Sequence, residues 1–135
     1  MKKIFALILV FAFLALSSTA EAVEESRVEI HSITFFLNST EVTVRVDYSL
    51  ESLTEFSVKL FGDAPIKREI QNLFDGENIE FLSVSESEAF LKFGVHQSVL
   101  EPVRFDREIK NVSFVFSDGT TITVHNRTVT PRVFF

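Results

Sequence analysis

The sequence contains no cysteine and no tryptophan, and only four glycines and three prolines among its 135 residues. Without cysteine the chain cannot form a disulfide framework, a thiolate metal site or a thiol nucleophile. The scarcity of glycine and proline excludes a fibrous repeat, and a hydrophobic content of 46% is too high for a disordered chain. The net charge of −6 argues against a nucleic-acid-binding protein, which normally carries a basic surface.

The first 22 residues have the layout of a secretory signal peptide. Two lysines precede thirteen consecutive apolar residues, Ile4 to Leu16, and small residues then follow up to Ala22. An apolar helix of this length spans roughly 20 Å, which is less than the roughly 30 Å core of a bilayer. We therefore expect cleavage after Ala22, with 1–22 as the signal peptide and 23–135 as a single domain. Retention of the segment as an N-terminal anchor is the alternative.

The expected mature product is a small exported domain. It would have 113 residues, with eleven basic side chains, eighteen acidic side chains and thirteen phenylalanines. We expect it to be secreted or held at the cell surface or cell envelope. Because it has no disulfides, apolar burial must stabilise it, and the phenylalanines are the main candidates for its core. Five asparagines, two glutamines and one methionine are few thermolabile residues, which favours a thermophilic or archaeal source.

Alternating apolar and polar residues predict strands over most of the mature chain. A β-hairpin is predicted first, with strands at 28–37 and 41–49 and its turn at 38–40. The apolar positions change from odd to even numbers near Lys110, which indicates a bulge or a short break. Asp118-Gly119 marks a second hairpin turn. The later strands are predicted at 79–84, 89–95, 112–116 and 120–125, with a short strand at the end of the chain.

Between the two groups of strands, the segment from about 52 to 75 has helical features. Ser52 and Glu55 match a capping box, and Gly62 suits the left-handed end of a first helix. Leu53, Phe56 and Leu60 follow at helical spacing, although residues 53–61 also alternate as a strand would.

A second helix is predicted after Asp63, which would act as its cap, and Gly76 would end it. Ile66, Ile70, Leu73 and Phe74 form its apolar stripe. The fold class that follows is α+β, with an antiparallel sheet of about six strands and the helical segment 52–75 packed on one face. An all-β sandwich is the alternative if residues 53–61 form a strand.

The three histidines are the candidate metal ligands of the sequence. His31, His96 and His125 all fall on the more polar faces of predicted strands, but their spacing matches no metal motif. The chain also lacks a glycine-rich phosphate loop and a nucleophile elbow. We therefore expect neither a metal nor a cofactor.

Two pairs of carboxylates are candidates for acid–base catalysis, namely Glu86 with Glu88, and Asp106 with Glu108. Such catalysis needs one carboxylate in an apolar environment and a second one that stays ionised. A turn rich in serine and glutamate provides neither environment. We expect no enzyme activity, and a small exported hydrolase that uses carboxylates remains the alternative.

Three N-x-S/T sequons begin at Asn38, Asn111 and Asn126. They fall at a predicted turn, at the phase change and just after a strand, where a glycan would be tolerated. In an exported protein of a eukaryotic or archaeal host, these asparagines are possible glycosylation sites.

The end of the chain is apolar, with Val133, Phe134 and Phe135 in sequence. Such a segment can form a strand against its own sheet or against that of a partner. We therefore interpret the chain as a cell-surface or secreted binding or structural protein. A protein partner or self-association is expected through an apolar sheet edge or through this segment, and no nucleic acid is expected. The membrane would be involved only through an uncleaved signal segment.

Overall fold

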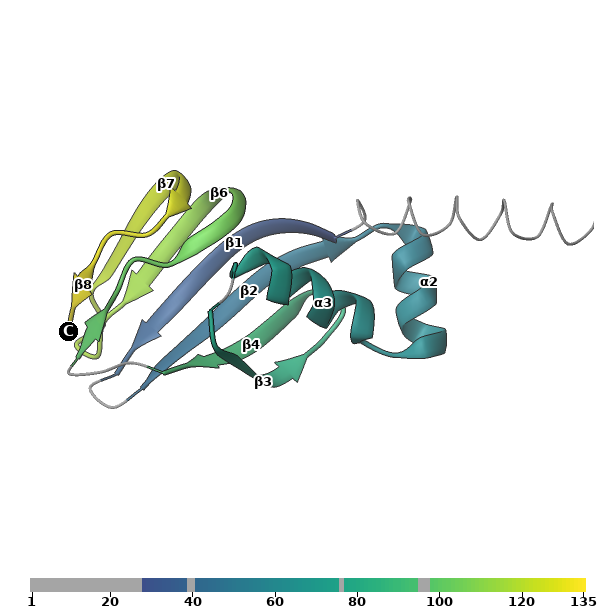
Figure 1. Ribbon diagram of the computed structural model, residues 1–135, viewed down its shortest axis with the longest axis horizontal. Helices are drawn as coiled ribbons and strands as arrows, with labels where there is room; N and C mark the ends of the chain where they lie inside the picture. Colours follow the sequence, from purple (N-terminus) through teal and green to yellow (C-terminus); the bar gives the residue numbers. More distant parts are fainter. Residues whose placement is uncertain (1–27, 39–40, 76, 95–97) are drawn as a thin grey trace, which may run out of the picture.

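In a computed structural model of the chain, a helix lies across one face of a six-stranded sheet (Figure 1). The structure describes residues 28–38, 41–75, 77–94 and 98–135. The predicted signal segment and its cleavage point at Ala22 lie outside these residues. The elements are β1 (Val28–Leu37), β2 (Val42–Leu50), α2 (Ser52–Phe61), α3 (Ala64–Leu73), β3 (Ile79–Val84), β4 (Glu88–Phe93), β5 (Val99–Leu100), β6 (Arg104–Val115), β7 (Thr121–Val129) and β8 (Val133–Phe134).

The sheet has the strand order β3-β4-β2-β1-β6-β7. Tight connections make β1–β2, β3–β4 and β6–β7 antiparallel, as predicted. The expectation of a wholly antiparallel sheet is wrong at one place, because β1 and β6 are parallel from Ser32–Asn111 to Phe36–Val115. In the strand order, β2 and β1 lie between β4 and β6. The connection from β4 to β6, which contains β5, is long enough to pass them, so β6 can lie beside β1 and run in the same direction.

The core lies between the sheet and α3. Phe35 in β1 stacks on Phe93 and Phe114, with ring centroids 6.0 and 5.3 Å away. Phe74, just after α3, meets Phe93 and Phe105 edge-on at 5.3 and 5.8 Å. These five rings are the buried phenylalanines of the described chain, whereas others are half-buried or exposed, so the core uses fewer of them than the sequence suggests.

Both predicted helices form, so the all-β alternative is wrong. In α3 the predicted stripe of Ile66, Ile70 and Leu73 is fully buried. Gly62 follows α2, as predicted, with a φ of +93° that favours glycine, but its ψ of −170° lies outside the left-handed helical conformation expected there. The predicted caps differ, because Glu51 and not Ser52 is the N-cap of α2, and Asp63 caps α3 without a side-chain hydrogen bond. Gly76 lies outside the described residues.

The apolar stripe of α2 faces solvent, which corrects the expectation that the whole helical segment packs on the sheet. Leu53, Phe56 and Leu60 are each about 60% exposed. The side turned inward carries Thr54, which is buried, and Val58, which packs against the edge of the core. Helix α2 contacts mainly α3 and stands at one end of the sheet (Figure 1).

The predicted phase change in β6 is present. Phe105 and Ile109 are buried at odd positions, and Val112 and Phe114 are buried at even positions. A register irregularity between β6 and β7 lies in the same strand, between residues 104 and 109. One continuous twelve-residue strand replaces the shorter one predicted, and the switch of buried positions between 109 and 112 comes after this irregularity.

The second hairpin turns at the predicted place. Gly119 has a φ of +89°, a conformation that side chains rarely adopt. The backbone N–H of Thr120 donates to the Asp118 carboxylate at 2.9 Å, and this hydrogen bond lowers the pKa of that carboxyl. The turn joins β6 to β7, which is the edge strand of the sheet.

The C-terminal segment pairs within its own chain. Val133 and Phe134 of β8 form a separate two-stranded sheet with Leu100 and Val99 of β5. The N–H of Phe135 extends this pairing by donating to the carbonyl of residue 98 at 2.9 Å. The expected terminal strand is therefore present, but it lies beside the main sheet and not within it.

Candidate binding surface

The histidines that the structure describes do not converge on a site. His31 in β1 is exposed, and its Nε2 lies 2.8 Å from the Ser49 hydroxyl. His125 in β7 is also exposed, and its Nδ1 lies 2.8 Å from the Asn111 side-chain oxygen. His96 lies outside the described residues. Within those residues, no three His, Asp or Glu side chains come close enough to hold a metal ion.

The second predicted carboxylate pair lies beside a packing contact. The guanidinium of Arg107 in β6 donates two hydrogen bonds to Asp106, at 2.7 and 3.0 Å, and another to Glu69 of α3. The hydrogen bonds that Arg107 donates to Asp106 raise the pKa of Arg107; burial opposes this rise, and the hydrogen bond to Glu69 adds to it. The Arg107–Glu69 pair thus fastens α3 to β6, and the neighbouring Asp106 holds the guanidinium in place.

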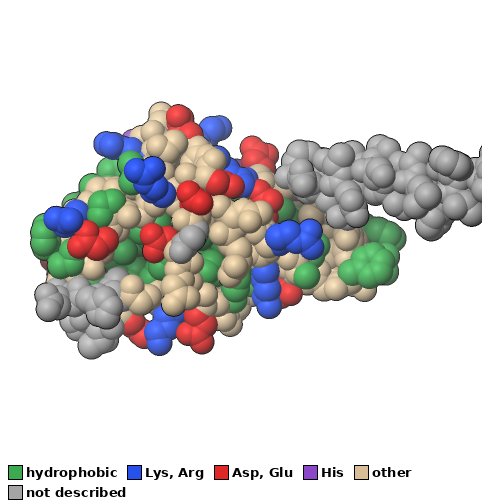
Figure 2. All heavy atoms as spheres, in the orientation of Figure 1, with side chains coloured by type: hydrophobic (Ala, Val, Ile, Leu, Met, Phe, Trp, Pro, Cys, Tyr) green, Lys and Arg blue, Asp and Glu red, His purple; other side chains and the backbone are tan. Residues whose placement is uncertain are grey.

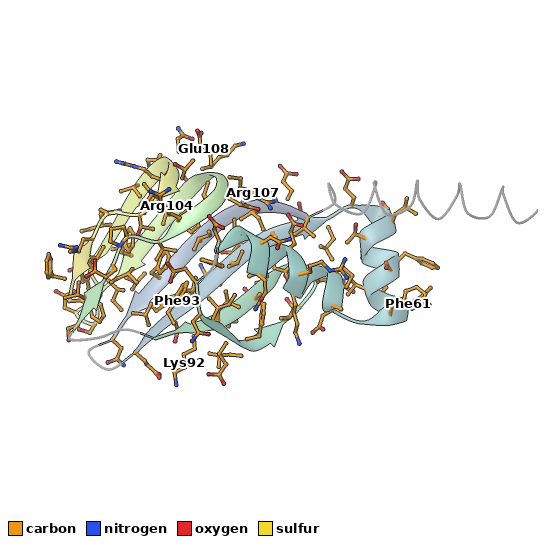
Figure 3. All side chains as sticks on the ribbon, viewed as in Figure 1. Phe61, Lys92, Phe93, Arg104, Arg107 and Glu108 are labelled. Carbon is orange, nitrogen blue, oxygen red and sulfur yellow. The ribbon has the colours of Figure 1, made fainter. Side chains whose placement is uncertain are left out.

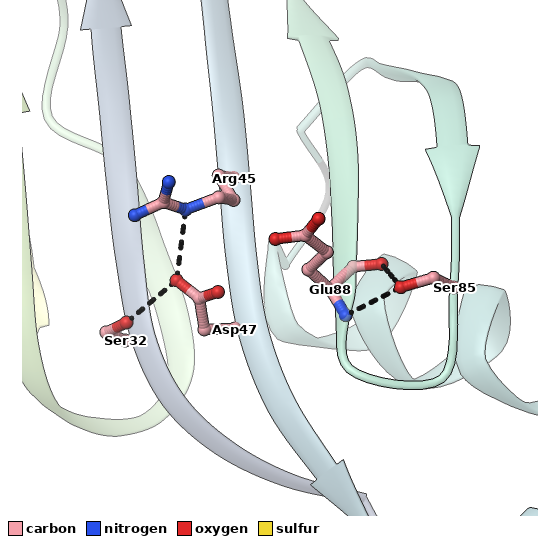
Figure 4. A network of polar contacts seen from close by, with 5 residues as sticks. All are labelled: Ser32, Arg45, Asp47, Ser85 and Glu88. Carbon is pink, nitrogen blue, oxygen red and sulfur yellow. Dashed lines mark hydrogen bonds and ion pairs between the residues drawn. The ribbon is translucent and has the colours of Figure 1, made fainter.

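The first predicted carboxylate pair belongs to the turn between β3 and β4. The Ser85 hydroxyl accepts a hydrogen bond from the backbone N–H of Glu88 at 3.1 Å and donates to the Glu88 carbonyl at 3.0 Å (Figure 4). The Tyr48 hydroxyl donates to the Ser85 carbonyl and lies 3.1 Å from the Glu88 carbonyl. Glu86 is exposed at the tip of this turn. These hydrogen bonds show that Ser85, Glu88 and Tyr48 hold the turn between β3 and β4 in place.

Tyr48 makes the stability of this turn dependent on pH. Burial raises the pKa of its phenol above the ordinary value of 10.0, and the Asp63 and Glu88 carboxylates raise it further. A phenol whose pKa is higher in the folded state than in the unfolded state stabilises the fold. This contribution is complete below about pH 10 and is lost as the pH rises from there towards the pKa of the folded state. The free energy of unfolding should therefore fall above about pH 10, and Tyr48→Phe should flatten that fall.

The chain makes this prediction easy to measure, because Tyr48 is its only tyrosine and it has no tryptophan. Phenolate absorbance during an alkaline titration therefore reports this one residue. Removal of the buried hydroxyl should also cost about 1 kcal/mol at neutral pH. Titration of the folded protein at the ordinary phenol pKa would contradict the contacts described above.

The face of the sheet opposite α3 carries a small polar network. Asp47 accepts hydrogen bonds from the Ser32 hydroxyl at 3.1 Å and from Arg45 Nε at 3.2 Å (Figure 4). The Arg45 guanidinium also lies over the Phe36 ring, 5.7 Å from its centroid. These side chains are half-buried and hydrogen-bond to one another, so the network stabilises this part of the open face.

The predicted partner segment borders an apolar groove of about 270 Å³. Alternate side chains of the β6–β7 hairpin form one wall, and β8 with its preceding residues forms the other. Phe134 is 69% exposed at the rim, and Ile122 is 51% exposed on the edge strand. The lining residues are Phe114, Phe116, Ile122, Val124, Pro131, Arg132, Val133 and Phe134. Arg132 is paired with Glu101 at 2.9 Å, so the interior of the groove is apolar.

Strand β7 beside this groove is an edge of the sheet. Among the described strands only β6 pairs with it, and eight of its nine residues are exposed. A strand with one unpaired side offers backbone donors and acceptors to another chain. The sequence predicted this strand but gave no indication that Ile122 and Val124 would share a groove with the C-terminus. The alternation of apolar residues at 122 and 124 is the signal that could have indicated it.

A second hollow, of about 330 Å³, lies where β1 begins and β2 ends. Arg107 lines it, but its guanidinium is held by Asp106 and Glu69. Four exposed apolar side chains also lie on α2, away from both hollows. The groove beside β7 is therefore the hollow that combines an apolar interior with an open sheet edge.

The sequons occupy exposed positions on three different elements. Asn38 follows β1, Asn111 lies within β6, and Asn126 lies in β7 with a φ of +55°. Because Val112 and Val124 pair on the core side, Asn111 and its neighbour His125 lie on the opposite side of the sheet. A glycan on Asn111 would thus stand away from the groove.

Comparisons of the chain with protein-family models, with curated proteins and with solved structures give no match. None of the helices in the described part of the chain is long and apolar enough to cross a membrane.

Proposed function

We propose that the chain is an exported, non-enzymatic structural protein that joins copies of itself through β7 and the adjacent groove. The supporting observation is that an unpaired sheet edge and an apolar groove lie side by side, bordered by Phe134. An extended chain that adds to β7 gains backbone hydrogen bonds, and its apolar side chains would enter the groove. This is the self-association through a sheet edge or the C-terminal segment that the sequence indicates.

A second copy fits this surface because the surface is self-complementary. It presents an exposed aromatic side chain, Phe134, and the groove that could accept one from another molecule. A two-fold contact places each patch against the same patch of the partner. The rotation also makes the two edge strands antiparallel, so that a pair of six-stranded sheets would continue as one.

Sedimentation velocity over a concentration series tests this proposal. Double replacement of Ile122 and Phe134 by serine should weaken association at least tenfold, because two large apolar side chains leave the contact. Leu82→Ser is the matched control, since Leu82 is 53% exposed on β3 at the opposite edge of the sheet. Equal effects of the two changes, or a wild-type chain that stays monomeric throughout, would reject the proposed contact.

Export is the remaining part of this proposal. The apolar run from Ile4 to Leu16 and the small residues up to Ala22 support cleavage after Ala22 and a secreted or cell-envelope location. In an archaeal or eukaryotic host, glycans on Asn111 would leave the groove open. The intact mass of the exported protein tests both the cleavage and the glycosylation. We expect a chain that begins at residue 23, and a product that begins at Met1 would overturn the cleavage.

A further inference from the structure

Helix α2 is amphipathic, but it lies with its apolar side outward. Leu53, Phe56, Leu60 and Phe61 project into solvent, and Phe61 is 80% exposed at the end of the molecule (Figure 3). The hydroxyl of Thr54 is turned inward, where it has no hydrogen-bond partner among the described residues. A surface helix normally does the reverse and buries its apolar stripe. We propose that this side of α2, the α2 face, binds the surface of a lipid bilayer.

The position of α2 in the fold supports a bilayer as its partner. Val28, the first residue of β1, pairs with Leu50, two residues before α2 begins. The chain that arrives from the apolar run Ile4–Leu16 therefore enters the domain beside α2. Only residues 17–27 separate that run from β1, and even a fully extended chain covers at most roughly 40 Å over this distance. The bilayer that receives the apolar run during export is thus within reach of the α2 face.

The chemistry of the α2 face also fits the interfacial region of a bilayer. Its large side chains are leucine and phenylalanine, and the nearest charges, Glu55 and Lys59, pair with each other at 3.3 Å on its flank. Helices of this kind lie in the plane of the interface and bury their apolar side among the acyl chains. Because the helix and its two caps carry two acidic residues and one lysine, binding should depend on apolar insertion more than on anionic lipids.

A second copy of the chain is a weaker candidate for the α2 face. A ten-residue helix is roughly 15 Å long and 10 Å wide, so its outer side covers roughly 150 Å². A stable protein interface needs about 800 Å² on each partner. A bilayer accepts a short helix because it requires no matching shape. Hydrophobic side chains at the surface of this end are visible in Figure 2.

Tryptophan fluorescence can test the proposal locally, because the chain has no tryptophan of its own. Phe61→Trp places a reporter on α2, and Leu82→Trp places a matched reporter at an exposed position of β3, outside both candidate surfaces. With phosphatidylcholine vesicles and the protein as exported, we expect a blue shift of Trp emission from position 61 and its quenching by brominated acyl chains. The reporter at position 82 should show neither change. An uncleaved apolar run would by itself hold position 61 near the bilayer, because the run enters the domain beside α2. The variant described next keeps the same N-terminal segment and so separates tethering from insertion.

A second variant separates insertion from simple proximity. Replacement of both Leu53 and Phe56 by serine, in the Phe61→Trp protein, should weaken vesicle binding at the α2 face roughly tenfold or more. Both side chains are exposed, so the fold should be unchanged by circular dichroism.

Three results would overturn the proposal. They are the absence of a shift at position 61, an equal shift at position 82, or a shift at position 61 that needs no vesicles and grows with protein concentration. The last would assign the α2 face to a second copy. Because these readouts concern α2, they are independent of the association proposed at β7.

Discussion

Replacement of Phe35 by alanine should lower the free energy of unfolding by about 3–5 kcal/mol. Phe35 is fully buried in β1, near the middle of the sheet, where it stacks on Phe93 and Phe114. The change removes a large apolar surface and leaves a cavity between rings that are held by three different strands. Urea unfolding followed by circular dichroism measures the loss.

Two further variants make this result specific. Phe35→Leu keeps part of the side-chain volume, so its free energy of unfolding should lie between those of the wild type and Phe35→Ala. Phe134→Ala removes an aromatic ring that is 69% exposed, so it should change the stability of the monomer by less than about 0.5 kcal/mol. Because a small domain has only about 5–15 kcal/mol of stability, Phe35→Ala should bring the chain close to unfolding. A loss below about 1 kcal/mol would show that the core is not built around this ring.

Local periodicity predicts most elements of the fold. The strands 28–37 and 79–84 and the stripe of α3 follow from side-chain alternation and helical spacing, which are properties of neighbouring residues. The hairpin turns follow from short polar segments, and the place where α2 ends follows from Gly62. Each of these features is determined within a few residues, so one sequence is enough to indicate it.

Features that depend on distant residues were not predictable in this way. The parallel pairing of β1 with β6 joins segments about 80 residues apart, and no local pattern records it. The cap of α2 shifted from Ser52 to Glu51, because the capping box is a local preference that the surrounding fold can override.

The candidate surfaces were also only partly predictable. Val133, Phe134 and Phe135 were named because an apolar chain end is conspicuous in a sequence. The exposure of the apolar stripe on α2 is not predictable from the sequence, because a stripe such as Leu53 and Phe56 has the same spacing whether it faces a core or solvent. Burial depends on the fold around the helix, and here α3 takes the position over the sheet.

The two candidate surfaces lie at opposite ends of the long axis of the molecule (Figure 1). Helix α2 is at the end where the chain enters β1, and β8 is at the other end. We propose that the first end meets a bilayer while the second joins copies of the protein. This arrangement would suit a structural component of a cell envelope, since each contact leaves the other surface free.

A cysteine scan along β7 should show a large dependence of disulfide cross-linking on position. The chain has no cysteine, so one cysteine at a time at positions 121–129 gives a clean cross-linking readout. In an antiparallel contact across a two-fold axis, residues at the axis meet their own copies with Cα atoms about 4.5–5.5 Å apart, which suits a disulfide. Two residues further along, the same atoms are roughly 13 Å apart and cannot be joined.

The yield of disulfide-linked dimer at each position under mild oxidation is therefore the most direct measurement of the proposed assembly. The account predicts a sharp maximum at one or two neighbouring positions of β7, with little product from control cysteines at Leu82 on β3 and Phe61 on α2. It also predicts that replacing Phe134 by serine lowers this maximum. A flat profile along β7, or more dimer from either control than from any β7 position, would contradict it.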